Sequence, residues 1–520
     1  MTVLCPRSRI HLKPVLRVLL AGICLTAPVA CRAETARGYR QLADEGVARG
    51  DYQQAAEDYR AEAAVYSRLG DVNAAKIEEM KAQRWSTTVR LYTTTAPDPT
   101  SARRLFTGAK YEPVYGCYLG GYVEADDSLS DAADSRGRRL PQEEAFDDVV
   151  GKRLATFFQY VHYGEPFPRW AGEVSRRGIA PHIAFEPNDG LDVVRDDAYL
   201  QRFARQAAAC KMPVFLRFAA EMNGDWTNYH DNPALYRRKF RLVHDVMARL
   251  APNVVMVWCP NTIPEDTIDE YYPGDDVVDW VGVNFYSVLH HDNNPSVPAD
   301  FEHPVSMLKY IYAKYSARKP IAICEYGASH RESLAPDVDR SPVAAAKILE
   351  LFAAIPREFP RVKLIDIFDC DNLRHARAGR RLNDYSVTNS PSVLAAFREA
   401  VAPDFYLSSV PGPPNVESGS ADLPPTDLPT YVHPITPDLA MTGIARVSAF
   451  IKTYEDRPTV VYSVDGHVIR RLVSPGDYSI DLDTSKLSPG KHVLGVRVID
   501  SYGRTAAARQ EPIEVVAAKS

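Results

Sequence analysis

The feature that most constrains the fold is a repeat in the middle of the chain, where short apolar runs alternate with longer stretches of helical pattern. β-Branched and aromatic residues dominate these runs, which is typical of buried strands. The eight runs cover residues 113–119, 154–160, 182–185, 214–218, 254–259, 280–285, 321–324 and 364–368. Strand–helix units of roughly 36 residues, repeated eight times, predict an α/β fold of the (β/α)8 TIM barrel type over residues 105–408.

The segment before the barrel, residues 34–100, has apolar residues spaced three and four apart, which predicts helices. Two turns, Gly50-Asp51 and Gly70-Asp71, resemble those of tetratricopeptide-type helical hairpins. About one and a half such units are too few for a free-standing solenoid. We therefore expect a tetratricopeptide-like helical brace on the next domain, with a protein-contact module as the alternative.

The segment after the barrel divides into two parts. Residues 409–438 carry eight prolines among Ser, Thr and Asp, which predicts an extended linker. Residues 439–520 alternate apolar and polar side chains in short runs, and Asp465-Gly466 is a hairpin signal. This pattern predicts an immunoglobulin-like β-sandwich, which would act as a spacer or contact carbohydrate.

The N-terminal residues 1–33 have the pattern of a secretory signal peptide. Basic residues precede an apolar stretch at 18–27, which is shorter than the roughly 20 residues a bilayer requires. Small residues then lead to Cys31-Arg32-Ala33. We expect a secreted or periplasmic protein with no integral membrane span in the mature chain. The alternatives are an uncleaved anchor and lipid attachment at Cys31, which Pro28 disfavours.

Charge and cysteine content exclude several kinds of partner. The 61 basic and 67 acidic residues give a net charge of −6, which argues against nucleic-acid binding. The mature cysteines show no CxxC or zinc-ligand spacing, so we expect no metal and no other cofactor. We interpret them as small buried residues, although an exported protein can also form disulfides. These cysteines are Cys117, Cys210, Cys259, Cys324 and Cys370.

Two glutamates follow strands that face each other across the mouth of the predicted barrel. Glu221 follows the fourth run and Glu325 the seventh, and TIM-barrel chemistry takes place where strands end. Retaining hydrolysis of a glycosidic bond needs two carboxyl groups about 5–5.5 Å apart. We therefore predict that Glu221 and Glu325 are catalytic. Arg217, on the same strand as Glu221, would keep one of the carboxyls ionised.

Other polar and aromatic side chains near strand ends are candidates for binding substrate. Trp226 offers a flat apolar face for a sugar ring, and Tyr286 can hydrogen-bond a carboxylate. The expected substrate-binding residues are Arg217, Asn223, Trp226, Tyr286, Trp258 and Glu186.

Three of these segments resemble glycoside hydrolase family 26, over about residues 111–408. Residues 217–226, Arg-Phe-x-x-Glu-Met-Asn-Gly-x-Trp, resemble its acid/base segment, residues 325–327 its nucleophile segment and residues 281–286 its sixth strand. The resemblance implies that Glu221 is the acid/base, Glu325 the nucleophile and Trp226 a sugar platform. The family contains mostly endo-β-1,4-mannanases, with β-1,3-xylanases and lichenases among them. It implies an endo-β-glycosidase resembling a mannan endo-1,4-β-mannosidase, acting on a polysaccharide.

Two positions depart from the best-known mannanases, and both would line the subsite of the cleaved sugar. Ala220 stands where they carry His, and Phe368-Asp369 stands where they carry Trp. An exopolysaccharide of the producing cell is therefore an alternative substrate. A further alternative is a non-catalytic carbohydrate-binding barrel that acts as a receptor or scaffold. The retention of both glutamates favours the enzyme.

Overall fold

The computed structural model describes residues 35–95, 105–129, 131–297, 299, 302–411, 431–437, 439–455, 457–473 and 478–516. The predicted signal peptide with Cys31, and most of the Pro-rich segment, lie outside these residues. Packing divides the chain into two compact units. The first comprises Met1–Thr88, Lys452–Pro458 and Arg497–Ala508, and the second comprises the rest, including the barrel. Within the described ranges, every helix is too short or too polar to cross a bilayer.

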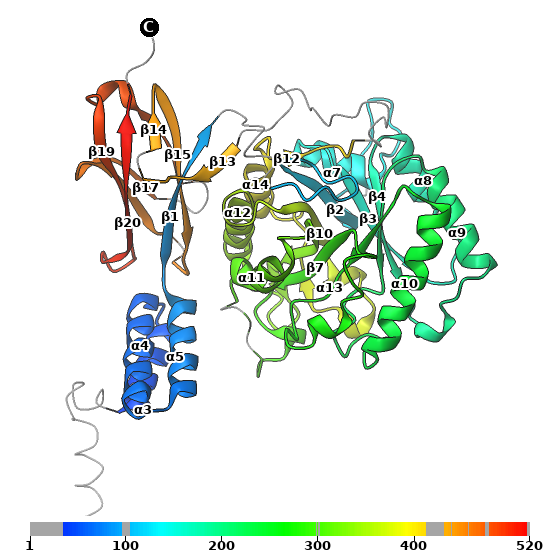
Figure 1. Cartoon of the computed structure of the whole chain (residues 1–520), viewed down its shortest axis with the longest axis horizontal. Helices are drawn as coiled ribbons and strands as arrows, with labels where there is room; N and C mark the ends of the chain where they lie inside the picture. Colours follow the sequence, from blue (N-terminus) through cyan, green and yellow to red (C-terminus); the bar gives the residue numbers. More distant parts are fainter. Residues whose placement is uncertain are drawn as a thin grey trace, which may run out of the picture. The chain divides into compact units, whose positions relative to one another are not determined.

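The predicted (β/α)8 barrel is confirmed (Figure 1). Its strands are all parallel, and each pairs with the next along the chain. The last strand pairs with the first, from Leu364↔Tyr118 to Ile367↔Gly121, and this closes the barrel. The strands are β2 (Cys117–Ala125), β3 (Thr156–His162), β4 (Ala180–Glu186), β5 (Val214–Phe218), β6 (Val254–Trp258), β7 (Trp280–Ser287), β8 (Ile321–Ala328) and β10 (Val362–Cys370).

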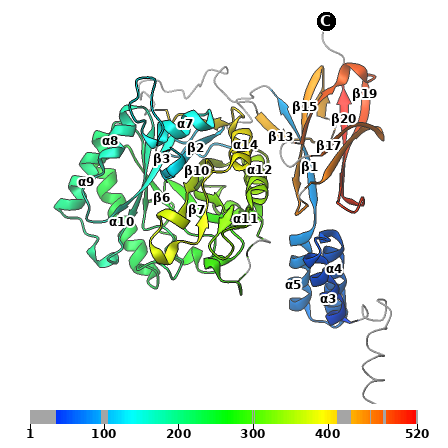
Figure 2. The same cartoon turned by 180° about the vertical axis from the view of Figure 1, so that it is seen from behind.

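Helices surround the barrel, as Figures 1 and 2 show from opposite sides. A large apolar core lies between them and the outer faces of the strands, where Phe185 of β4 stacks on Phe203 at 4.4 Å. The helices are α7 (Gln142–Val150), α8 (Arg169–Arg176), α9 (Ala198–Ala209), α10 (Pro233–Leu250), α11 (Pro304–Tyr315), α12 (Ser341–Glu358), α13 (Asn372–His375) and α14 (Pro391–Val401). Shorter elements are η1 (Asp127–Leu129), η2 (Leu191–Val193), η3 (Ile268–Tyr271), η4 (His291–Asn293), η5 (Ala378–Arg380), β9 (Arg331–Glu332), β11 (Asn383–Asp384) and β12 (Tyr406–Leu407).

The first barrel strand lies further along the chain than the predicted run at 113–119. It extends to Ala125 through Gly120 and Gly121, residues that are uncommon in strands. A Cβ on Gly120 would lie 1.8 Å from Thr156 Oγ1 and 1.9 Å from Asp366 Oδ1. Only glycine fits at this close approach, so the strand lacks the β-branched signal that marks the others.

Buried polar groups fill part of the barrel interior. His182 Nδ1 lies 2.6 Å from Asp366 Oδ2, and both side chains are fully buried. Burial alone would lower the pKa of His182, but the Asp366 carboxylate raises it to about 9. The five described cysteines are free thiols, and all except the partly exposed Cys210 are buried, which agrees with their interpretation as small core residues.

The N-terminal helices are α3 (Ala36–Ala48), α4 (Tyr52–Arg68) and α5 (Val72–Trp85). Asp51 and Asp71 of the two predicted turns cap α4 and α5 by accepting bonds from Gln54 N (3.2 Å) and Ala74 N (3.0 Å). The helical prediction is wrong beyond Trp85. The β-branched residues of Thr88–Thr95 form strand β1 instead.

The predicted β-sandwich corresponds to two sheets, ordered β13-β1-β15-β18 and β14-β20-β19-β16-β17. Residues on either side of the barrel sequence build the first sheet, because β1 precedes the barrel and β13 lies in the predicted linker. The hairpin at Asp465-Gly466 joins β16 and β17. The C-terminal elements are β13 (Tyr431–Pro434), β14 (Leu439–Met441), β15 (Ile444–Lys452), β16 (Thr459–Val464), β17 (His467–Val473), β18 (Tyr478–Asp483), η7 (Thr484–Lys486), β19 (Gly490–Ile499) and β20 (Thr505–Val515).

Candidate active site

Glu221 lies in a strained turn directly after β5. Its φ is 57° and that of Ala219 is 49°, both in the left-handed region that non-glycine residues rarely adopt. The Glu221 backbone N–H donates to Cys259 O (2.8 Å), which ties the turn to the end of β6. The strain is therefore held by neighbouring structure, as is common at functional sites.

Three side chains hydrogen-bond the Glu221 carboxyl. Oε1 accepts from Asn261 Nδ2 at 3.0 Å and from Asn284 Nδ2 at 2.9 Å. Oε2 accepts from Trp226 Nε1 at 2.6 Å. The fourth, fifth and sixth barrel strands thus lead to residues that fix the orientation of this one carboxyl.

Glu325 lies within β8, and a bulge turns it into the barrel. Val283 pairs with Ile323 but Asn284 pairs with Glu325, so β8 has one extra residue, Cys324, at this point. Cys324 belongs to the interior cluster, and Glu325 also points inward. Its carboxylate accepts hydrogen bonds from Arg217, from Tyr286 and from Tyr160 OH (2.8 Å).

Arg217 connects the two glutamates. Its guanidinium is fully buried, forms an ion pair with Glu325 and donates through its other terminal nitrogen to Asn284 Oδ1 at 3.0 Å. It also lies over the Phe158 ring at 4.4 Å. Burial would lower the pKa of Arg217, but the negative charge of Glu325 raises it well above its ordinary value, so the arginine stays charged.

Glu221 holds its proton more tightly than an ordinary glutamate. Burial raises the pKa of Glu221, and the nearby charge of Glu325 raises it further, against the opposing effect of the hydrogen bonds to its carboxylate. Glu325, by contrast, has a permanent cation beside it. Glu221, which favours its protonated form, is suited to the role of acid. Glu325, which is paired with Arg217, is suited to the role of nucleophile.

Trp226 and an aromatic cluster flank the carboxyls. Trp226 is 42% exposed. A Cβ on Gly224 would lie 2.3 Å from its indole ring, which explains the glycine two residues before it. On the Glu325 side, Phe368 stacks on Tyr122 at 5.0 Å and meets Tyr286 edge-on at 5.5 Å.

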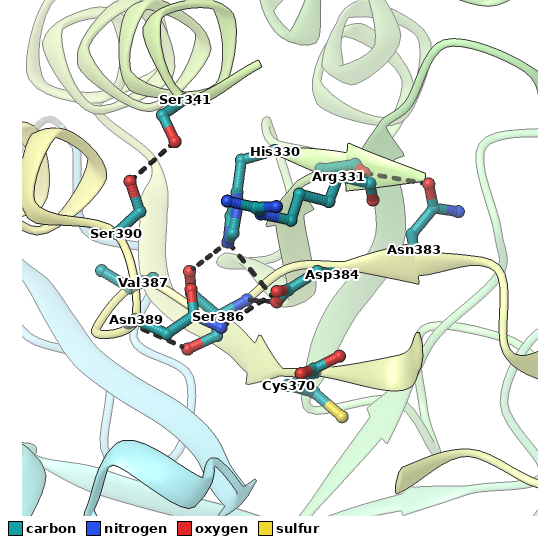
Figure 3. Close-up of polar contacts among 12 residues, drawn as sticks. His330, Arg331, Ser341, Cys370, Asn383, Asp384, Ser386, Val387, Asn389 and Ser390 are labelled. Atoms are coloured by element: carbon teal, nitrogen blue, oxygen red, sulfur yellow. Dashed lines mark hydrogen bonds and ion pairs between the residues drawn. The ribbon is translucent and has the colours of Figure 1, made fainter. Parts of the chain in front are cut away.

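The loops after β8 and β10 support this cluster. They pair through β9 and β11. Figure 3 shows that His330 of the first loop contacts the second, with Nε2 3.0 Å from Ser386 O and 3.4 Å from Asp384 Oδ1. Ser390 donates to Ser341 at the start of α12 (2.7 Å). These contacts hold the segment that carries Tyr385, whose ring lies 5.1 Å from that of Tyr286.

Three predicted substrate contacts have other surroundings. Trp258 is fully buried in the outer core against Tyr272 and Tyr315. Its neighbour Val257 faces the interior, and alternation along β6 turns Trp258 outward, so it is not part of the site. Asn223 uses its amide to bond the backbone of Asn261 and Pro264.

The third of these residues, Glu186, is 8% exposed, and the Tyr229 hydroxyl bonds its carboxyl. Arg217, Trp226 and Tyr286 do surround the two glutamates.

Sequence reasoning missed Tyr160, Asn261 and Asn284. Asn261 follows the end of β6, whereas Tyr160 and Asn284 lie within β3 and β7, two and three residues before the strands end, so the strand-end rule points clearly only to Asn261. Their amide and phenol groups carry no charge, however, and many such residues occur elsewhere in the chain.

Comparison with known proteins identifies related sequences. The profile of Glycosyl hydrolase family 26 matches residues 185–307, which include Glu221 but end before Glu325. Endoglucanase H of Acetivibrio thermocellus is 25% identical over 315 residues, 56% of this chain and 32% of that protein. A β-1,3-xylanase of a Vibrio species is 37% identical over 98 residues, 18% of this chain and 20% of that protein. The chain thus spans a third or less of the length of these relatives.

Among solved structures, a family 26 β-mannanase from Bacteroides ovatus is 14% identical, with a TM-score of 0.39. The match covers 58% of this chain and 90% of that one.

Proposed function

We propose that this chain is a member of glycoside hydrolase family 26 and a retaining endo-β-glycosidase acting on a β-linked polysaccharide. The match of the family profile to residues 185–307 supports this. The observation that carries the proposal is the bonded chain Glu221–Asn284–Arg217–Glu325, which joins two carboxyls of different environment at one end of the barrel. Two such carboxyls are what double displacement requires.

In the first step, Glu325 attacks the anomeric carbon while Glu221 gives its proton to the glycosidic oxygen. The bond to the leaving sugar breaks, and a covalent glycosyl ester on Glu325 forms. Hydrogen bonds from Arg217, Tyr160 and Tyr286 hold the Glu325 carboxylate in position until the attack.

In the second step, Glu221 takes a proton from water as the water oxygen attacks the anomeric carbon. The ester bond breaks and Glu325 leaves as a carboxylate. The configuration at that carbon is retained, and both glutamates return to their starting protonation states.

A β-1,4-mannan-like polysaccharide is the substrate we propose, with a sugar ring packed on the exposed face of Trp226. Family membership supports this choice. The relatives named above are an endoglucanase and a β-1,3-xylanase, so other β-glycans belong in any test. Ala220 and Phe368 stand where the best-known mannanases carry His and Trp. Because of these differences, an exopolysaccharide of the producing cell is the alternative substrate. We propose a secreted or periplasmic location, as residues 1–33 predict.

Reducing-sugar release from mannan, mixed-linkage glucan and β-1,3-xylan tests the proposal, with Glu325→Ala as the inactive control. We expect release from at least one polysaccharide by the native chain and none by the variant. Binding to a polysaccharide without release from any of them would instead identify a carbohydrate-binding barrel.

A further inference from the structure

The Tyr229 hydroxyl, buried beside the proposed active site, lies between two hydrogen-bond acceptors. Its oxygen is 2.7 Å from the Ala220 carbonyl oxygen and 2.5 Å from Glu186 Oε2. Glu186 ends β4, while Tyr229 and Ala220 belong to the segment after β5. The hydroxyl therefore joins the third barrel strand to the turn that carries Glu221.

The number of protons that Tyr229 and Glu186 carry determines which hydrogen bonds they and the Ala220 carbonyl can form. A tyrosine hydroxyl has one proton to donate, a carbonyl oxygen only accepts, and an ionised carboxylate also only accepts. If Glu186 were ionised, Tyr229 could donate to only one of its two neighbours, and the other would receive no hydrogen bond from it. If Glu186 is protonated, it donates to Tyr229, and Tyr229 donates to Ala220. Only the protonated form lets the Tyr229 hydroxyl make a hydrogen bond to both neighbours at once.

The charges around Glu186 favour the same form. Burial raises the pKa of Glu186 to about 7, and the charges of Glu325 and Glu221 add to this effect against Arg217 and the Tyr229 hydrogen bond. Tyr236 of α10 is a further titratable neighbour, and the charge of Glu186 raises its pKa. His162 pairs with Glu186 along β3, but its ring lies 3.5 Å from Asp189.

The Ala220 carbonyl lies within the strained turn. It belongs to the peptide that joins Ala220 to Glu221, and Ala219 and Glu221 both have positive φ. Such conformations persist only where surrounding contacts enforce them. The bond from Tyr229 is a contact of this kind, made to the peptide group directly before the proposed acid/base.

We propose that Glu186 is a positioning residue that works in its protonated form. Its proton lets Tyr229 hold the Ala220 carbonyl and so keeps the Glu221 turn in place. When the proton is lost to solvent, Tyr229 turns to the new carboxylate, the carbonyl loses its donor, and a negative charge appears beside Glu221. The kinetic consequences of this proposal rest on the proposed function. The protonation of Glu186 does not depend on it.

The pH dependence of kcat/KM tests the proposal in Glu186→Gln and Glu186→Ala. The glutamine amide can donate to Tyr229 as the protonated acid does, but it cannot ionise. We measure from about pH 5 to 9. In the native protein, we expect the fall of kcat/KM on the alkaline side to follow the loss of two protons, one from Glu221 and one from Glu186. In Glu186→Gln, it should follow the loss of the Glu221 proton alone. At about pH 5, Glu186→Ala should lose tenfold or more, and Glu186→Gln should recover most of this loss.

Two controls make the kinetic result specific. Tyr229→Phe should lower kcat/KM throughout the pH range, because the Ala220 carbonyl then has no donor at any pH. Glu332→Gln alters another buried glutamate of the barrel, one that bonds the Leu289 backbone (2.7 Å), and should leave the alkaline limb unchanged. Equal losses in Glu186→Gln and Glu186→Ala, or an alkaline limb that Glu186→Gln does not alter, would overturn the proposal.

Infrared spectroscopy tests the ionisation without any substrate. The carbonyl stretch of protonated carboxyl groups, followed in the full chain across the same pH range, should show one titrating group fewer in Glu186→Gln, with a midpoint near 7. Glu332→Gln should match the native protein. Identical titrations in the native protein and Glu186→Gln would refute the proposal even if every polysaccharide assay were negative, whereas the expected difference without activity would refute only the proposed function.

Discussion

Asn284 donates a hydrogen bond of 2.9 Å to Glu221, and through its amide oxygen it accepts one of 3.0 Å from Arg217. Because Arg217 also forms an ion pair with Glu325, this one amide lies between the two carboxyls proposed to carry out the reaction. Asn284→Ala removes both bonds and leaves the backbone of β7 intact. We expect kcat to fall by about 10- to 100-fold with little change in KM, since the amide orients reacting groups and does not bind remote sugars. Steady-state kinetics measure this, and a rise in KM alone would contradict the role.

Glu221→Ala should affect substrates according to their leaving group. A poor leaving group needs a proton as the bond breaks, whereas a good one departs as an anion. We expect unactivated glycosides to slow by about 100-fold or more and activated aryl glycosides to slow far less in the glycosylation step. Equal slowing of both classes would remove Glu221 as the acid.

Glu325→Ala should abolish turnover and leave a space beside Arg217. Small anions such as azide or formate can enter that space and attack an activated aryl glycoside in place of the missing carboxylate. We expect added azide to restore part of the activity and to yield a glycosyl azide, identified by mass spectrometry. Full activity without azide would mean that the nucleophile is another residue.

Two tryptophans with opposite environments offer a paired test. Trp226 is exposed beside Glu221, so Trp226→Ala should raise KM for polysaccharide about tenfold with little effect on stability. Trp258 is buried in the core, so Trp258→Phe should destabilise the barrel by about 1–3 kcal/mol and leave KM unchanged. Urea unfolding and steady-state kinetics separate the two effects. A higher KM in Trp258→Phe would contradict the assignment of Trp258 to the core and indicate that it contacts substrate.

The stability of the barrel should decline as pH rises toward 7, in part because of Asp147 on α7. Burial raises the pKa of Asp147 to about 7, so the folded chain binds a proton that the unfolded chain releases at lower pH. This contribution is complete below the ordinary pKa of aspartate and is lost as pH rises through about 7. Asp147→Asn keeps a neutral side chain at every pH.

Unfolding measurements at pH 5 and pH 8 test the role of Asp147. Between these two values, the native protein should lose about 1–2 kcal/mol more than Asp147→Asn, a figure reduced because the carboxyl is partly exposed. Identical losses in both proteins would show that Asp147 does not cause the decline.

Local patterns in the sequence predicted the barrel and the two glutamates. β-Branched and aromatic residues mark the strands in the sequence. The carboxylates that follow the fourth and seventh runs point to function, because a barrel built only for stability does not need acidic residues at this end. Where the pattern failed, the cause was contact with distant residues. Gly120 weakens the signal of β2 because Thr156 and Asp366 occupy the space of its side chain, and β1 joins a sheet whose other strands lie beyond the barrel sequence.

The details of the site depend on which way each side chain faces, and strand-end position alone does not decide this. Val257 and Trp258 differ by one residue and face opposite sides of the barrel wall. At Glu325, the bulge in β8 makes both it and Cys324 face inward, so simple alternation would have misplaced one of them. The Tyr229–Ala220 contact depends on a strained turn that no sequence pattern indicates.

The anomeric configuration of the first product tests the central claim most directly. Proton NMR, recorded within the first minutes of polysaccharide hydrolysis, distinguishes the α from the β reducing end before mutarotation mixes them. Double displacement by Glu325 and Glu221 predicts that the β anomer forms first and the α anomer follows only as equilibrium is approached. Initial release of the α anomer would show that water attacks the sugar directly, and would contradict the role assigned to Glu325.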